Sequence, residues 1–167
     1  MWVREEMLSD REAVRAVNVA AFESELEADL VDALREQVEP LVSLVVEEDD
    51  MIVGHILFSP VSIENHPEMP LMGLAPMAVE PSRQGQGIGT AMLRVGLERC
   101  AELGAAAVVV LGHPAFYPRF GFVPASQYSI VSEYDAPDEA FMVLELQPGA
   151  LDGVEGLVRF HPAFAEA

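Results

Sequence analysis

The stretch Ser82–Leu93 reads SRQGQGIGTAML and joins two segments of different periodicity. Residues 71–79 before it are apolar and short, as expected of a strand, and residues 90–103 after it carry apolar side chains at helical spacing. Its three glycines remove Cβ atoms where the chain turns tightly into the helix. Because free amides and the positive end of the helix dipole converge at such a turn, it suits a phosphate group.

Three kinds of phosphate-binding glycine loop compete for this stretch. A P-loop requires Gly-Lys-Ser/Thr, and the chain contains no lysine. A dinucleotide fingerprint requires G-x-G-x-x-G, which Gly85 and Gly87 begin but Thr90 interrupts. The third kind, Q/R-x-x-G-x-G/A, fits Gln84, Gly87 and Gly89.

The segments before the loop predict a strand, two helices and a hairpin. Trp2–Met7 reads as a strand, and capping boxes at residues 9–12 and 24–27 begin two short helices. Pro40 closes the second helix. Two arms rich in Val, Ile and Leu, at 41–47 and 51–63, flank an acidic turn and predict an antiparallel hairpin, with a bulge or edge position at Pro60.

The segments after the loop alternate between buried strands and short turns. We expect a buried strand at 105–111, a turn or two of helix at 114–120 and a last clear strand at 141–146, with an indistinct tail from Pro148. The order of elements predicts an α/β or α+β fold with a mixed sheet.

These motifs together resemble the GNAT superfamily of acyl-CoA N-acyltransferases. The loop matches the family's pyrophosphate loop, Pro76–Pro81 looks like its fourth strand, and Phe116–Phe122 resembles its tyrosine-containing segment. The resemblance is closest to a small bacterial-type branch with an H-P-x-x-Y-P-R-F-G-F segment, and it covers about Val3 to Leu146.

The resemblance implies a single N-acetyltransferase domain over residues 1–167, with a core at about 3–146 and an extension at 147–167. It also implies a mixed, mostly antiparallel sheet that is flanked by helices and splayed between the fourth and fifth strands.

In such a fold acetyl-CoA is the co-substrate. Its pantetheine arm would lie along Met77, Ala78 and Val79, and its pyrophosphate would sit on the amides of Gln84, Gly85, Gln86, Gly87, Ile88, Gly89 and Thr90. Arg83 either adds a charge-assisted contact to this anion or is a solvated surface cation.

Tyr117 matches the family position that protonates or stabilises the departing thiolate; the alternative is a core tyrosine packed between aromatic neighbours. The strand position where some relatives carry a glutamate base is about Gly73 here. His113 is the candidate for the missing base because histidine exchanges protons near neutral pH; the alternative is that it shapes the turn that contains it.

Composition narrows the remaining functions. The chain carries 28 acidic residues against 9 arginines, a formal net charge of −19, which excludes the basic face that nucleic-acid binding requires. The same charge favours a cationic substrate, or reflects only the proteome of the organism.

One cysteine and isolated histidines such as His55 and His66 predict no metal site. The acidic N-terminus and the lack of a long apolar run predict a cytoplasmic protein without membrane attachment.

The sequence therefore predicts an enzyme that moves an acetyl group from acetyl-CoA to a primary amine by direct attack. The acceptor is a small-molecule amine or a protein N-terminus or lysine, with contacts expected from residues 23–27 and 127–138, and a homodimer is possible. The alternative is a non-catalytic acyl-CoA-binding or sensing domain, which would keep the loop without an efficient base.

Overall fold

The computed structural model describes residues 2–166, which fold into two compact units. Unit 1 comprises residues 2–59, 75–99 and 162–166, and unit 2 comprises residues 60–74 and 100–161. The chain passes from one to the other within β3 (Met51–Ile63), β4 (Leu71–Val79) and α3 (Ile88–Glu102). One domain over residues 1–167 stays a prediction, and Met1 and Ala167 lie outside the described residues.

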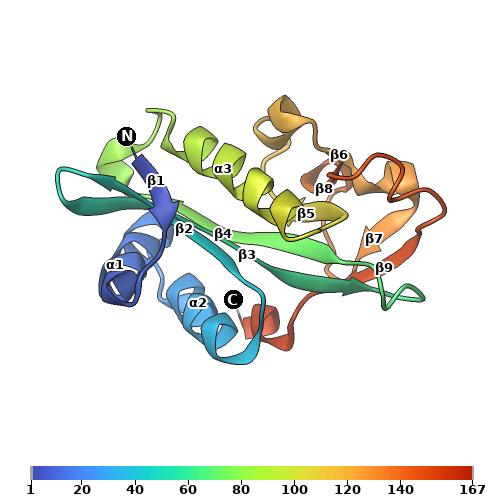
Figure 1. Ribbon diagram of the computed structural model, residues 1–167, viewed down its shortest axis with the longest axis horizontal. Coiled ribbons are helices and arrows are strands. Elements are labelled where there is room, and N and C mark those ends of the chain that lie inside the picture. Colours follow the sequence, from blue (N-terminus) through green and yellow to red (C-terminus); the bar gives the residue numbers. More distant parts are fainter. Residues whose placement is uncertain (1, 167) are drawn as a thin grey trace. The chain divides into compact units, whose positions relative to one another are not determined.

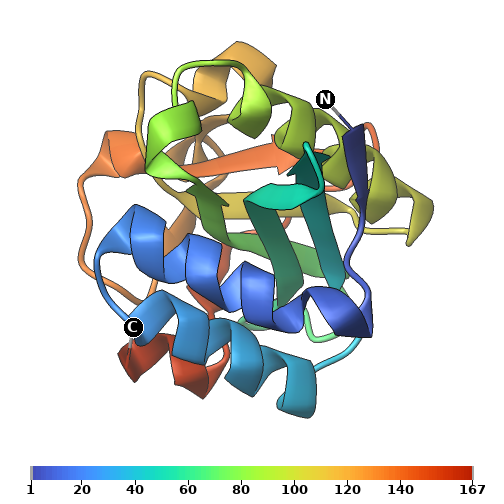
Figure 2. The same cartoon turned by 90° about the vertical axis from the view of Figure 1, so that its left-hand side faces the viewer.

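Unit 1 is a sheet with helices on both faces. Its strands neighbour one another in the order β1 (Trp2–Glu5), β2 (Val42–Glu48), β3, β4, and the β1–β2 and β2–β3 pairs are antiparallel. Helices α1 (Arg11–Phe22) and α2 (Leu26–Gln37) cover one face, and α3 covers the other (Figures 1 and 2). The predicted hairpin and the two early helices are thus confirmed.

Strand β3 is buried throughout its middle, residues 53–59, because both of its faces are covered. Towards α3 it presents Gly54, where a Cβ would lie 2.8 Å from a methyl carbon of Ile88. In return α3 presents Gly96, where a Cβ would lie 2.2 Å from the ring of Phe58. These two glycines let the helix lie directly on the strand, and any larger residue would force α3 away.

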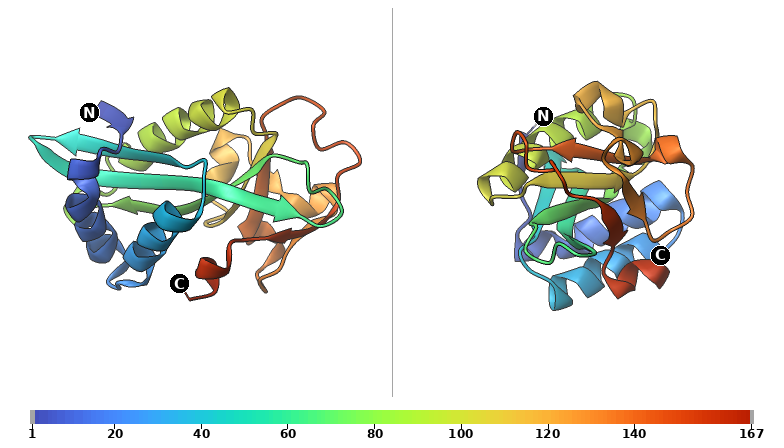
Figure 3. Two further views of the ribbon diagram at one scale, coloured as in Figure 1. Left: turned by 60° about the horizontal axis from the view of Figure 1, so that its bottom comes forward. Right: turned by 90° about the vertical axis from the view of Figure 1, so that its right-hand side faces the viewer.

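The opposite face holds an aliphatic cluster between α1, α2 and the sheet. Its buried members are Val14, Leu30, Val31, Leu34, Val45 and Leu57. The C-terminal turn η6 (Pro162–Glu166) lies beside α2 (Figure 3), where Ala163 and Phe164 pack against this cluster. The tail that local patterns left undefined therefore packs residues 163 and 164 against the core of unit 1.

Unit 2 is built from two short sets of strands. In the first, the start of β4 pairs in parallel with β5 over three residue pairs, Leu71–Gly73 with Ala107–Val109, which agrees with the predicted splay of these strands. The order then continues through antiparallel β8 to β6. In the second set, the end of β3 pairs with β9, and β9 pairs with β7. The bounds are β5 Ala107–Leu111, β6 Val123–Pro124, β7 Ile130–Ser132, β8 Phe141–Glu145 and β9 Gly156–Arg159.

The capping box predicted at residues 9–12 is wrong. Asp10 precedes α1 but its carboxylate makes no cap to that helix. It accepts instead from the amide of Met7 at 2.7 Å and from two guanidinium nitrogens of Arg4 at 2.7 and 3.0 Å. A charged bidentate partner is stronger than a backbone amide, so Arg4 determines the orientation of this carboxylate. At α2 half of the predicted box forms, because the Ser24 hydroxyl accepts from the amide of Leu26 at 3.1 Å.

His55 is fully buried on β3 and belongs to a polar network. The sequence alone indicates no partner for this histidine. Its Nδ1 lies 3.1 Å from the side-chain amide nitrogen of Asn18, and its Nε2 lies 2.9 Å from Ser43 Oγ. The Ser43 hydroxyl donates to Glu6, which also pairs with Arg35. Since that hydroxyl has one hydrogen, Nε2 must carry the ring proton and Nδ1 must accept from Asn18. The ring is therefore neutral.

Burial, with a smaller effect from the charge of Arg35, lowers the pKa of His55 to about 3. Between the unfolded pKa near 6.5 and this value, only the unfolded chain takes up the proton. We therefore expect this residue to reduce the free energy of unfolding by about 1.4 kcal/mol per pH unit as the pH falls through that window. Denaturant titrations at several pH values in this window should show that the free energy of unfolding depends less steeply on pH in His55→Gln than in the wild type. A His55 ring resonance that titrates near pH 6.5 would contradict the neutral assignment.

Candidate active site

The predicted phosphate loop is the connection between β4 and α3 in unit 1. After β4, the Glu80 carboxylate accepts from the amide of Ser82 at 2.8 Å and from its hydroxyl, which closes the turn η2 (Pro81–Arg83). The Gln84 side chain then donates to the carbonyl of Val79 at 3.2 Å. Both side chains tie the loop back to the end of the strand, so Gln84 has a structural role in the turn.

The glycines of the loop adopt backbone angles that other residues rarely reach. Gly85 has φ 78° and Gly87 has φ 85°, both in the left-handed region. A Cβ at either position would meet no atom within 4 Å, so the space over this part of the loop is open. Glycine is therefore required by backbone conformation, and the open space leaves room for a ligand to approach the backbone.

The start of α3 provides the donors for an anion. The first helical hydrogen bond runs from the Ala91 amide to the carbonyl of Gly87 at 3.0 Å. The amides of Ile88, Gly89 and Thr90 therefore have no hydrogen-bond acceptor within the helix, as in the first turn of every α-helix. Together with the dipole of a 15-residue helix, they make a site for phosphate oxygens.

Arg83 is held by the acidic turn of the β2–β3 hairpin. Its Nη1 donates to Glu48 at 3.1 Å, and its Nη2 lies 3.8 Å from Asp49. The guanidinium is therefore a paired side chain rather than the solvated surface cation that the sequence left open. Nothing in the local pattern indicates this pairing, because the partners lie in different elements.

Met77, Ala78 and Val79 end β4 and lead directly into the loop. Ala78 is buried, and its two neighbours are half-buried. Earlier in the same strand, Gly73 belongs to unit 2, where a Cβ would lie 2.8 Å from Val61 and 3.4 Å from the Phe160 ring. There is accordingly no room for a glutamate base at this position.

Tyr117 and His113 lie together in unit 2, in and before the turn η3 (Tyr117–Phe120). The tyrosine ring packs over Gly112, where a Cβ would lie 2.4 Å from ring carbon Cε2, and meets Phe116 and Phe122 edge-on. Burial raises the pKa of Tyr117 to about 12. Within residues 2–166 its hydroxyl has no hydrogen-bond partner, so this proton is available to a ligand.

His113 contributes to the turn through its backbone and exposes its ring. Its carbonyl accepts from the amides of Phe116 at 3.1 Å and Tyr117 at 3.5 Å. The structure thus shows the turn-shaping role that the sequence allowed, while leaving the ring at the surface.

The other reactive residue types are placed elsewhere. Cys100 is buried, and burial raises the pKa of its thiol to about 12, so it stays a neutral thiol. In the described part of the chain, no three His, Cys, Asp or Glu side chains are grouped as metal ligands. Nor is any helix among residues 2–166 long and apolar enough to span a bilayer.

Comparison with known proteins identifies the family of this chain. Residues 40–124 match the family described as "Acetyltransferase (GNAT) domain". The chain is 38% identical over 165 residues to the Escherichia coli protein "Uncharacterized N-acetyltransferase YhbS", and the match covers 98% of both chains.

Two solved structures share both the fold and a substantial part of the sequence. E. coli YhbS in complex with CoA superposes with a TM-score of 0.91 at 36% identity, covering 98% of this chain and 91% of that one. A GNAT acetyltransferase from Brucella melitensis in complex with acetyl-CoA gives a TM-score of 0.79 at 37% identity, covering 98% and 97%. The chain therefore belongs to the GNAT family of acetyltransferases.

Proposed function

We propose that the protein transfers an acetyl group from acetyl-CoA to a primary amine by direct attack, without a covalent enzyme intermediate. The observation that carries this proposal is the β4–α3 loop, in which left-handed glycines leave open space over a helix start with unpaired amides. Relatives at 36% and 37% identity were solved with CoA and acetyl-CoA, which supports the same ligand here.

The donor is held mainly by backbone groups of unit 1. The pyrophosphate lies on the amides of residues 84–90, and the pantetheine arm runs along Met77, Ala78 and Val79. Pro76 has no N–H, so the amides for the arm and the thioester carbonyl come from these three residues, and only those that point away from β3 are available. Arg83 keeps further N–H donors for a phosphate while Glu48 fixes its orientation.

In the reaction, the amine nitrogen bonds to the acetyl carbonyl carbon, the carbon–sulfur bond breaks, and the nitrogen loses a proton. An amide of β4 stabilises the negative charge that develops on the carbonyl oxygen. We assign proton removal to solvent through the exposed ring of His113, since Gly73 leaves no place for a carboxylate.

Tyr117 stabilises the departing thiolate by a hydrogen bond rather than by complete proton transfer. A phenol with a pKa of about 12 is a weaker acid than a thiol near 8.5, so full transfer is uphill by about 5 kcal/mol. A hydrogen bond to the developing negative charge avoids this cost, and the unpartnered hydroxyl is free to make it.

The proposed activity is tested by incubating the protein with acetyl-CoA and a panel of primary amines. We expect release of coenzyme A thiol together with acetylated amine detected by mass spectrometry. Coenzyme A binding with no acetylated product from any amine would favour the acyl-CoA-binding or sensing alternative.

For the loop, we expect Gly87→Glu to abolish coenzyme A binding measured by calorimetry. The side chain enters the open space over the loop, and its charge repels a phosphate. Gly87→Gln is the matched control, because it carries the same backbone strain of about 1–2 kcal/mol without the charge. It should bind more weakly than wild type but measurably. If the glutamate variant bound coenzyme A with wild-type affinity, the loop would not be part of the donor site.

For the tyrosine, we expect Tyr117→Phe to lower kcat by about 10- to 100-fold, the value of a hydrogen bond to a charged group, with little change in the KM for acetyl-CoA. The loss should shrink with an acetyl thioester of a more acidic thiol, because that thiolate needs less stabilisation. Equal turnover by variant and parent would reduce Tyr117 to a packing residue.

A further inference from the structure

Unit 1 contains a cavity of about 520 Å³ between α1 and the tip of the β2–β3 hairpin. In Figure 2 the tip of the hairpin faces the viewer, and α1 lies below it. All of the lining residues belong to unit 1. The volume lies within the range of small-molecule sites, about 300–1,000 Å³.

One side of the cavity is apolar and is called the apolar wall below. It comes from α1 and β3 and consists of Ala13, Ala16, Val17, Ala20, Met51 and Ile52. Because alanine carries only a methyl group, three of the four helix positions leave space open along α1. Ile52 packs against the aliphatic cluster on this face of the sheet, so the wall is continuous with the core of unit 1. Such a wall suits the apolar part of a small molecule.

Arg4 is the one cationic side chain of the lining, and its donors are engaged. Its Nε donates to Glu47 at 3.0 Å, and its Nη1 donates to Asp10 at 2.7 Å and to the carbonyl of Glu5 at 3.1 Å. Its Nη2 donates to Asp10 at 3.0 Å and lies 2.9 Å from a carboxylate oxygen of Glu47. These contacts occupy all the N–H groups of a guanidinium, so Arg4 offers none to an anionic ligand.

Two further carboxylates of the lining have no cationic partner. The Asp50 side chain, in the hairpin turn, makes no hydrogen bond or ion pair within residues 2–166. Glu80 accepts from Ser82 through one oxygen, Oε2, and pairs with no cation in that part of the chain. Since Arg4 is already balanced by Asp10 and Glu47, the cavity is negative, and it favours a cation over an anion.

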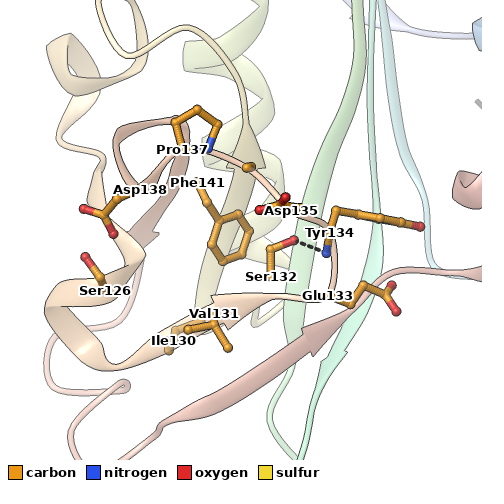
Figure 4. Close-up of a pocket in the computed structure, with 11 residues that line it drawn as sticks. Ser126, Ile130, Val131, Ser132, Glu133, Tyr134, Asp135, Pro137, Asp138 and Phe141 are labelled. Carbon is orange, nitrogen blue, oxygen red and sulfur yellow. Dashed lines mark hydrogen bonds between the residues drawn. The ribbon is translucent and has the colours of Figure 1, made fainter.

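Unit 2 has a cavity of its own, of about 360 Å³, beside β7. Figure 4 shows the Phe141 ring at its centre, with Asp138 on one side and Asp135 on the other. This cavity is also acidic, so only substitutions can show which of the two a cation occupies. No residue lines both cavities, and a variant in one therefore serves as a control for the other.

We propose that the cavity of unit 1 is a further small-molecule site, which binds a compact organic cation with an apolar body. Asp50 and Glu80 attract the charge, and the apolar wall contacts the body. The volume fits a small molecule, and the net charge of −19 disfavours a second copy of this chain at the same surface. The site is independent of the acetyl transfer proposed above.

The test compares benzylguanidinium with its neutral counterpart benzylurea, which has the same shape without the charge. An alkylguanidinium stays protonated at neutral pH, so it does not attack acetyl-CoA as a free amine, and its binding is read without turnover. Calorimetry should show saturable binding of benzylguanidinium and at least about fivefold weaker binding of benzylurea, the effect of one exposed ion pair. Equal binding of the two compounds, or no saturable binding of the cation, would overturn the proposal.

Substitution of Asp50 locates the bound charge. We expect Asp50→Asn to weaken the binding of benzylguanidinium about fivefold. Asp49→Asn is the matched control, because Asp49 shares the turn and its left-handed backbone, φ 51° against 62°, but lies outside the lining. Asparagine tolerates this backbone conformation at both positions. Asp135→Asn is the control for the cavity of unit 2. Both controls should bind like the wild type, and an equal loss in either would overturn the assignment to Asp50.

A second variant fills the cavity without changing its charge. Ala16 is exposed on α1, so a larger side chain there enters the cavity and not the core. We expect Ala16→Trp to abolish binding of benzylguanidinium and to keep an unfolding temperature close to that of the wild type. Binding that survives in a folded Ala16→Trp protein would show that the cation lies elsewhere.

Discussion

The absence of side chains at Gly54 and Gly96 is the packing constraint on which the donor site depends. A Cβ at Gly96 would overlap the Phe58 ring at 2.2 Å, and one at Gly54 would press on Ile88 at 2.8 Å. With neither present, α3 lies directly on β3, and its first turn begins at Ile88, after the loop that follows β4. That turn follows directly on Gly85 and Gly87, where a Cβ would meet no atom within 4 Å. A displaced helix would carry the phosphate site away with it.

The excess of acid explains why the proposed phosphate site uses the backbone. Arg4, Arg15 and Arg35 are paired with carboxylates of unit 1, and Arg83 is held by Glu48. In a chain without lysine, few cationic side chains remain to attract an anionic donor. Amide dipoles at a helix start meet this need because they attract an anion without a cationic side chain. The same excess leaves Asp135 and Asp138 without an ion-pair partner among residues 2–166.

The reaction we propose depends on hydrogen bonding more than on strong acids and bases. Burial around Phe116 and Phe122 keeps Tyr117 protonated, and the tight packing of Gly73 against Val61 excludes a glutamate base. Thioesters react readily with free amines, so positioning and stabilisation of charge account for much of the expected rate. An amine that arrives as a cation still has to lose its proton, and the exposed ring of His113 is the group assigned to pass it to solvent.

Local patterns were enough to determine the early helices, the β2–β3 hairpin, β4 and the glycine turn. Each of these follows from side-chain periodicity or backbone angles within a few residues, as the left-handed Gly85 and Gly87 show. The pairing of Arg83 with Glu48, 35 residues away, and the burial of His55 beside Asn18, 37 residues away, were decided only by the tertiary structure. So were the short strands β7 and β9 and the cavity beside them. Two to four residues carry too little periodicity to predict a strand, and a cavity forms only when segments distant in the chain pack together.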